Sequence, residues 1–371
     1  MPFKIHIAMK TSLKSLCLFL SLSIFSLAAF SQTNKETALI KGRQAVKYID
    51  EKKYEEAILL LEEAKKLDPD NYNYPYEMGY IYYLKENYTK AKEVYASLLN
   101  YPSINDQCYQ MLGNVYDMLG DSSNAMKTYD EGLKKFPSSG VLYLEKGNMF
   151  WNKKQYFEAI PFYEKGIEVS PKFASNYYRL SRIFCASTER IWGIIYGEIF
   201  MNLEKNSRRT AEISELLYST YNDAIKIGGE NKSSVSFSKS ISVSTNNSNK
   251  VPFQLVFEID MTMATIPFSL SSKKELDITS LNSIRQSFTE RWFTEKRNAE
   301  YPNILFEYHQ ELIKLNFFEA YNHWIFMKGN PKEFDSWQEK HPDVWEKFKT
   351  WFLKNSLKVD DTHHFYSGQY F

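Results

Sequence analysis

Small and aromatic residues recur along the chain at intervals of 34 residues. The recurrence is clearest between two copies of one pattern, the first opening at Asp106 and the second at Gly140. The matched pairs are Gly113 with Gly147, Tyr116 with Phe150, Ala125 with Ala159, Tyr129 with Tyr163, Gly132 with Gly166, and Pro137 with Pro171. Further copies in the same register open at Ala38, Tyr72 and Ala174. The pattern predicts a mainly α fold built from repeated helical hairpins.

Three positions of each copy have a physical explanation. The eighth and twentieth positions are always small, which lets two antiparallel helices approach closely, and the eleventh is always an aromatic residue that fills the space beside their crossing. The eighth positions are Ala45, Gly79, Gly113, Gly147 and Ser181, the eleventh are Tyr48, Tyr82, Tyr116, Phe150 and Phe184, and the twentieth are Ala57, Ala91, Ala125, Ala159 and Gly193. A proline near the end of four copies stops the preceding helix.

This pattern resembles the tetratricopeptide repeat family, whose units are helix–turn–helix hairpins of 34 residues. Residues 53–71 and 155–173 are close to the second helix and following turn of that family. The resemblance covers residues 38–187 and implies four repeats and a degenerate fifth. The fifth departs from the family pattern at Gly197, where a large residue is expected, and at Lys205, where proline is expected. We expect a helical solenoid over residues 32–228, with capping helices at its end.

The resemblance also implies a binding groove, because the first helices of successive units line the concave side of such an array. An extended peptide suits a surface of aromatic rings and amides, since rings take apolar side chains and amides pair with backbone groups. The alternative is that these rings only cover neighbouring helices. Lysines that some family members use to grip a C-terminal carboxylate are absent, so that mode is not expected. The candidate groove residues are Tyr76, Tyr80, Tyr83, Gln110, Asn114, Asp117, Leu144, Asn148, Trp151, Tyr178 and Arg182.

The first 31 residues have the pattern of a signal peptide. Lys10 and Lys14 precede an apolar stretch that is too short for a comfortable membrane span. Small residues at Ala29 and Ser31 predict cleavage before Gln32, and an uncleaved N-terminal anchor is the alternative. The sequence therefore predicts an exported protein, periplasmic or secreted.

The cysteines after residue 31 are Cys108 and Cys185, on first helices two units apart. That separation is far beyond the reach of a disulfide. We expect two buried or partly buried thiols.

Beyond the repeats, the hydrophobic period changes twice. Residues 190–206 are apolar nearly all round, which predicts a helix buried on both sides, and residues 208–227 predict a second capping helix. Within 229–275 the pattern alternates at period two and predicts a β-hairpin insertion with a turn at 246–249. A flexible Ser/Asn linker at 230–250 is the alternative. The apolar positions of the two expected strands are Val235, Phe237, Ile241 and Val243, then Phe253, Leu255, Phe257 and Ile259.

Residues 276–371 predict a C-terminal helical region rich in aromatic residues, which we expect to form a core rather than a ligand cage. Asp277 is the expected N-cap of its first helix, and Pro302 is expected to open one long helix that ends near Met327. Further breaks are expected at 329–331 and 341–342. The polar, aromatic end of the chain around His363 is expected to be disordered.

Candidate chemistry is sparse. The chain is 43% hydrophobic and 25% charged with a formal net charge of +1, which does not suggest a nucleic-acid partner. Glycine-rich phosphate loops, nucleophile elbows and paired-cysteine metal motifs are absent from the sequence. A metal or acid/base site could be assembled only from Glu307, His309, Glu311 and His323, and histidines satisfied in the core or by solvent are the expected reading.

The sequence as a whole predicts a non-enzymatic protein–protein interaction scaffold or adaptor without cofactors. Its partner would be a peptide or protein segment held in the concave groove of the repeats. The alternative is an enzyme or ligand-binding domain in the C-terminal half, with the repeats as its docking module. A cofactor is not expected in the first case.

Overall fold

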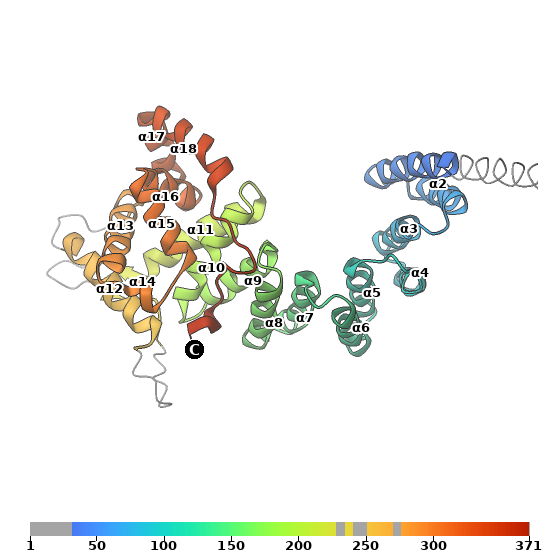
Figure 1. The fold of residues 1–371 in the computed structure, drawn as a ribbon, viewed down its shortest axis with the longest axis horizontal. Coiled ribbons are helices and arrows are strands. Elements are labelled where there is room, and N and C mark those ends of the chain that lie inside the picture. Colours follow the sequence, from blue (N-terminus) through green and yellow to red (C-terminus); the bar gives the residue numbers. More distant parts are fainter. Residues whose placement is uncertain (1–31, 228–233, 240–250, 270–275, 371) are drawn as a thin grey trace, which may run out of the picture. The chain divides into compact units, whose positions relative to one another are not determined.

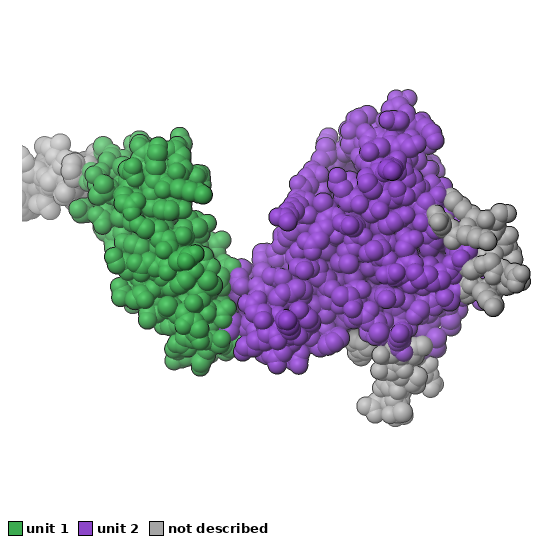
Figure 2. Space-filling model, turned by 180° about the vertical axis from the view of Figure 1, so that it is seen from behind, with its two compact units in different colours: residues 1–136 green, residues 137–371 purple. Residues whose placement is uncertain are grey.

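A computed structural model describes residues 32–227, 234–239, 251–269 and 276–370 (Figure 1). Contacts divide the chain into two compact units, Met1–Phe136 and Pro137–Phe371 (Figure 2). The boundary falls at the repeat proline Pro137, inside the array. The predicted signal peptide lies outside the described residues. The expected mainly α fold is confirmed in both units.

The first unit consists of helical hairpins. Residues 32–50 form a helix whose buried residues share a hydrophobic cluster with those of α2, and the next two hairpins are α3 with α4 and α5 with α6. The helices are α2 (Tyr54–Leu67), α3 (Asn73–Leu84), α4 (Tyr88–Leu98), α5 (Asp106–Met118) and α6 (Ser122–Lys135).

The turn inside each hairpin repeats with the sequence period. Lys52, Glu86 and Gly120 have left-handed φ angles of 60°, 57° and 79°, and Lys154 in the second unit has 60°. The amide after each of these residues donates to a carbonyl five residues back, as from Asn87 to Tyr82 at 2.9 Å. This bonding satisfies carbonyls at the end of the first helix and reverses the chain.

Small residues hold the paired helices close together, as the sequence predicted. Gly113 lies directly against the ring of Tyr129, and Gly147 lies in the same way against Tyr163. A Cβ atom on either glycine would collide with the ring. Tyr129 and Tyr163 are themselves fully buried, so the rings have no room to move aside.

The second unit begins with hairpin α7–α8 and continues into the C-terminal helices. Its elements are α7 (Gly140–Asn152), α8 (Tyr156–Val169), α9 (Ala174–Cys185), α10 (Arg190–Leu203), α11 (Arg208–Ala224), β1 (Ile225–Lys226), β2 (Ser234–Val235), α12 (Phe253–Ser269), α13 (Ile278–Thr294), α14 (Arg297–Glu300), α15 (Ile304–Lys314), α16 (Phe318–Phe326), α17 (Pro331–Lys340), α18 (Pro342–Asn355) and a 3-10 turn at Ser367–Tyr370.

The degenerate fifth repeat is a hairpin of α9 and α10. As predicted, α10 is buried on all sides, with nearly every residue from Ile191 to Asn202 shielded from solvent. Close packing of the two helices explains both of its glycines, including Gly197, where the family pattern has a large residue. A Cβ on Gly193 would lie 2.5 Å from the backbone nitrogen of Cys185, and one on Gly197 would lie 2.6 Å from the Ser181 hydroxyl. Small residues are needed here because α9 approaches α10 at both points.

The predicted β-hairpin insertion is corrected by the structure. A small antiparallel sheet is present, but it pairs Ile225 with Val235 and Lys226 with Ser234. The expected second strand at 253–259 is wrong, because these residues belong to α12. Apolar residues occupy most positions of α12, so an alternating set could be picked out, whereas the buried residues follow a helical period. They include Phe253, Val256, Phe257, Asp260, Met261 and Ala264. The expected turn at 246–249 lies outside the described residues.

The C-terminal helices match the sequence at their caps and differ at one break. Asp277 caps α13 by accepting from the Ser280 amide at 2.8 Å, as expected. The single helix expected from Pro302 to Met327 is wrong, since α15 and α16 are separated at Asn316, which has a φ of 57°. The Phe317 amide donates to Leu312 five residues back, which is the bonding of the repeat turns.

The end of the chain is packed, so the expected disordered tail is wrong. Phe365 is fully buried against Trp192 and Tyr196, and the Ser367 amide donates to the Tyr196 hydroxyl at 2.8 Å. The Tyr370 ring stacks on Phe253 with 4.3 Å between centroids. One hydrophobic core therefore joins the last two hairpins, the C-terminal helices and the chain end.

Cys108 and Cys185 are buried free thiols, as expected. Among the helices that the structure describes, none has the length and apolar character that a membrane span requires.

Candidate functional site

The candidate groove residues of the first unit are partly exposed aromatic and polar side chains. Tyr80 is 37% exposed, whereas Tyr76 and Tyr83 are half-buried. Tyr76 meets Tyr95 edge to face with 5.5 Å between centroids, and Tyr83 meets Tyr88 in the same way at 5.6 Å. Gln110 and Asp117 are also half-buried. The rings thus cover neighbouring helices and keep one edge at the surface.

The two groove asparagines bond within their own repeats. Asn114 accepts a hydrogen bond from the Tyr129 hydroxyl at 2.7 Å, and Asn148 accepts one from Tyr163 at 3.1 Å. The Nδ2 of Asn148 also donates to Glu145 at 2.9 Å. These amides lock the first helix of the repeat onto the tyrosine of the second. Their role as partners of a peptide backbone stays a prediction.

In the fifth repeat, helix α11 covers Tyr178, one of the predicted groove residues. Tyr178 is only 8% exposed, because its hydroxyl donates to Glu212 at 2.7 Å and Arg209 lies over its ring at 5.0 Å. The same Glu212 carboxylate pairs with Arg182 at 3.2 Å. The prediction that Tyr178 lines an open groove is therefore wrong, since charged residues of α11 cover its ring.

Two other predicted groove residues, Trp151 and Arg182, come together at a surface pocket of about 360 Å³. Tyr156 meets the Trp151 ring edge to face at 4.9 Å, and Phe157 is 65% exposed. Leu144, in contrast, packs against the core. The remaining pocket residues were not identified from the sequence, although an exposed aromatic pair at the start of a second helix was a visible signal. The lining residues are Trp151, Tyr156, Phe157, Arg182, Ile183, Ala186 and Ser187.

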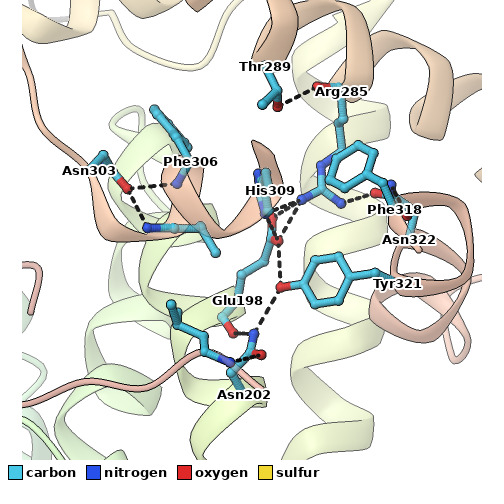
Figure 3. A network of polar contacts seen from close by, with 12 residues as sticks. Glu198, Asn202, Arg285, Thr289, Asn303, Phe306, His309, Phe318, Tyr321 and Asn322 are labelled. Atoms are coloured by element: carbon cyan, nitrogen blue, oxygen red, sulfur yellow. Dashed lines mark hydrogen bonds and ion pairs between the residues drawn. The ribbon is translucent and has the colours of Figure 1, made fainter. Parts of the chain in front are cut away.

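A second feature of this unit is a buried polar network (Figure 3). Glu198 of α10 forms an ion pair with Arg285 of α13 at 2.5 and 2.6 Å, and also contacts His309 of α15 at 3.0 Å. Each of the two charged side chains is 2% exposed. Tyr321 donates to the same carboxylate at 3.3 Å, and Asn322 accepts from Arg285. The bonds cross-link four helices.

The protonation states of the network follow from its geometry. Burial alone would raise the pKa of Glu198, but the guanidinium of Arg285 and the ring of His309 hold that pKa below its ordinary value. Burial lowers the pKa of His309, so its ring is neutral at pH 7. Because an ionised carboxylate only accepts hydrogen bonds, Nε2 of His309 carries the proton that faces Glu198.

Two members of the network stand where the repeats have small residues. Counted from the left-handed residue of the turn, His309 and Tyr321 correspond to Gly147 and Ala159 of the fourth repeat. Their rings lie 5.7 Å apart, and they fill the space between α15 and α16. The turn is that of a repeat, but two of its small positions hold rings with polar atoms.

The network has no room for a substrate. The cavity beside Glu198, Arg285 and His309 measures about 10 Å³, which is the space of a single water molecule. Its other lining residues are aliphatic and aromatic. We interpret the network as a structural cross-link.

The acidic and histidine side chains considered from the sequence do not assemble into one site. Glu307 and Glu311 line a surface pocket of about 290 Å³, whereas His309 lies in the buried network. His323 stacks on Trp337 at 4.2 Å and bonds the Glu319 carbonyl. Within the described ranges, no three His, Cys, Asp or Glu side chains are placed to hold a metal.

Comparisons with known proteins agree with the repeat geometry. A model of the tetratricopeptide repeat family matches residues 44–71, 106–134 and 141–173. The chain is 28% identical over 171 residues to the BBSome complex member BBS4 homolog of Drosophila melanogaster, covering 43% of this chain and 34% of that protein. It is 23% identical over 118 residues to BBSome complex member BBS4 of Bos taurus, covering 32% and 23%.

The chain thus spans about a third or less of the length of these relatives. Among solved structures, that of pilF from Pseudomonas aeruginosa is similar over 51% of this chain and 84% of that chain, with 15% identity and a TM-score of 0.41. The family match and the hairpin geometry show that this chain contains tetratricopeptide repeats.

Proposed function

We propose that this chain is a non-enzymatic scaffold that binds a segment of a protein partner, and that the contact is made at the Trp151 pocket. The observation that carries the proposal is the aromatic cluster at this pocket. Phe157 is among the most exposed large apolar side chains of the chain, and it adjoins Tyr156 and Trp151. Aromatic residues with a neighbouring arginine are the side chains most enriched where protein interfaces form.

Two further observations support a binding role. Tetratricopeptide repeats imply protein–protein interaction, and both curated relatives are named as members of a complex. The alternative, an enzyme in the C-terminal half built on the buried network, has less support, because the cavity of the network has room for only about one water molecule. An exposed apolar pocket is a more accessible feature than a sealed polar one.

A photo-crosslinking amino acid at residue 157 tests the proposal in the native host. We expect one partner protein to be captured at residue 157 and not at residue 353. Leu353 is a matched control because it is 72% exposed and lies on α18, away from the pocket residues. Capture at neither position, or equally at both, would contradict the proposal.

We also propose that the protein is exported and cleaved before Gln32. N-terminal sequencing of the protein isolated from the native host should then give Gln-Thr-Asn at residues 32–34. An intact N-terminus, or recovery with cytoplasmic markers, would contradict export.

A further inference from the structure

We infer that the Trp151 pocket selects a peptide segment in which one bulky apolar side chain is flanked by carboxylates. The inference rests on the proposed function and adds the chemistry of the partner. It depends on the shape of the pocket and on the charges around it.

The walls of the pocket call for an apolar side chain. Tyr156, Phe157 and Ile183 supply three apolar surfaces, and the Trp151 ring supplies a fourth. A volume of about 360 Å³ is near the lower end of ordinary ligand pockets, roughly 300–1,000 Å³. The pocket therefore suits one large side chain with its adjoining backbone rather than a folded surface.

The surroundings of the pocket are positively charged. Two guanidinium groups lie over the Trp151 ring, that of Arg179 at 4.8 Å and that of Arg182 at 5.1 Å. A guanidinium over an indole face can still use N–H groups in its own plane to bind a carboxylate. Arg182 already uses part of this capacity on Glu212 and Tyr178, so Arg179 is the main donor offered to a partner. Lys153 and Lys154 follow Trp151 in the exposed turn.

The protein's own carboxylates compensate only part of this charge. Glu212 is shared between Arg182 and Tyr178. In the part of the chain that the structure describes, Arg179, Lys153 and Lys154 form no ion pair with a carboxylate within 4.0 Å. Glu158, next to Phe157, and Glu145, which accepts a hydrogen bond from Asn148 on the helix of Trp151, are nearby negative charges. The excess is positive, so acidic residues on both sides of the inserted side chain complement it.

The second repeat offers a natural contrast. Tyr83 and Tyr88 form the same edge-to-face pair as Trp151 and Tyr156, at the same places in the 34-residue pattern. The residues that correspond to Arg179 and Arg182 are Met111 and Asn114. The second repeat thus has the aromatic pair without the two arginines, although Lys85 stands at the place of Lys153.

The test uses the full chain and three fluorescent peptides that differ only in charge. Each carries a central Phe, with Glu, Ser or Lys on both sides, and binding is followed by fluorescence anisotropy. We expect the Glu peptide to bind most tightly, with an affinity that falls as salt is raised. Phe157→Ala should weaken it by roughly tenfold or more, because an exposed anchor is lost without disturbing the fold.

Charge reversal and the second repeat supply the controls. Arg179→Glu should weaken the Glu peptide by roughly tenfold and strengthen the Lys peptide, since the sign of the rim changes. Tyr88→Ala, which breaks the aromatic pair of the second repeat, should leave both affinities unchanged. Circular dichroism verifies that every variant is folded.

The outcomes separate the two proposals. Equal binding of all three peptides with loss in Phe157→Ala would overturn the acidic preference and leave the binding function standing. Tight binding of the Glu peptide that ignores both substitutions would overturn the assignment to this pocket. Absence of binding for all three peptides, together with no crosslink at residue 157, would overturn the proposed function itself.

Discussion

The carboxylate of Glu198 and the guanidinium of Arg285 meet at 2.5 Å although 87 residues separate them in the sequence. Glu198 lies on α10, the second helix of the fifth hairpin, and Arg285 lies on α13 of the C-terminal region. The pair therefore ties the end of the repeats to the C-terminal helices. It is almost entirely withdrawn from water.

Removing one partner of this pair should be severe. Arg285→Met leaves the Glu198 charge buried without its cation, and loss of one member of a buried pair typically costs about 3–5 kcal/mol. Hydrogen exchange should show faster exchange in α10 and α13, with α5 of the first unit as the internal reference. The matched control is Lys165→Met, which breaks the surface pair of Lys165 with Glu168. A loss of stability in Arg285→Met that is no larger than in Lys165→Met would contradict a stabilising role for the buried pair.

The second unit should lose stability in acid in two stages. Burial lowers the pKa of His309 and of His323 below 6.5, so between 6.5 and those lower values the unfolded chain binds protons that the folded chain does not. Glu198, whose pKa is held below 4.5, adds a second stage beneath that value. Each such proton contributes up to about 1.4 kcal/mol per pH unit.

Urea unfolding at a series of pH values measures this dependence. Below pH 6.5, His309→Gln should reduce the slope of the unfolding free energy against pH. The contribution of His323 to that slope should remain. An unchanged slope would mean that His309 titrates alike in the folded and unfolded chain. A free energy of unfolding that is larger at pH 5 than at pH 7 would contradict a neutral, buried His309 ring.

Two buried tyrosines at the same place in successive repeats should respond differently to loss of the hydroxyl. The Tyr129 hydroxyl donates to Asn114, and the corresponding residue in the repeat of Tyr95 is Tyr80. Among the residues that the structure describes, the Tyr95 hydroxyl has no hydrogen-bond partner. Tyr129→Phe should cost about 1 kcal/mol, and Tyr95→Phe should be neutral or stabilising. Thermal unfolding of the two variants makes the comparison, and an equal loss in both would refute it.

The chain end should contribute to the core of the second unit. Phe365 is fully buried against Trp192 and Tyr196, so Phe365→Ala should cost about 3–5 kcal/mol. Asp361→Ala is the control on the same segment, since Asp361 is exposed. Hydrogen exchange of α10 and α12 should accelerate in the first variant only. Equal protection in both would show that the segment is dispensable.

The repeated hairpins could be predicted from the sequence because their physics is local. A hairpin of two helices is fixed by residues within one 34-residue unit, so Gly147 and Tyr163 disclose their contact through spacing alone. The same holds for the Asp277 cap and for the burial of α10, which an all-apolar helix cannot avoid. Two of the seven residues that line the pocket, Trp151 and Arg182, were predicted from the same repeat pattern.

Other features were decided only by the tertiary structure, because their partners are distant in the sequence. The run at 253–259 fits a strand or a helix by composition, and packing of its Phe253 face on Trp192 and Trp292 selects the helix. Tyr178 was expected to be open, and α11 covers it. The Glu198–Arg285 pair joins residues whose separation does not match the 34-residue repeat, so the sequence pattern did not indicate it. A sequence pattern indicates contacts between residues that are close along the chain. A contact across 87 residues depends instead on how the intervening chain folds.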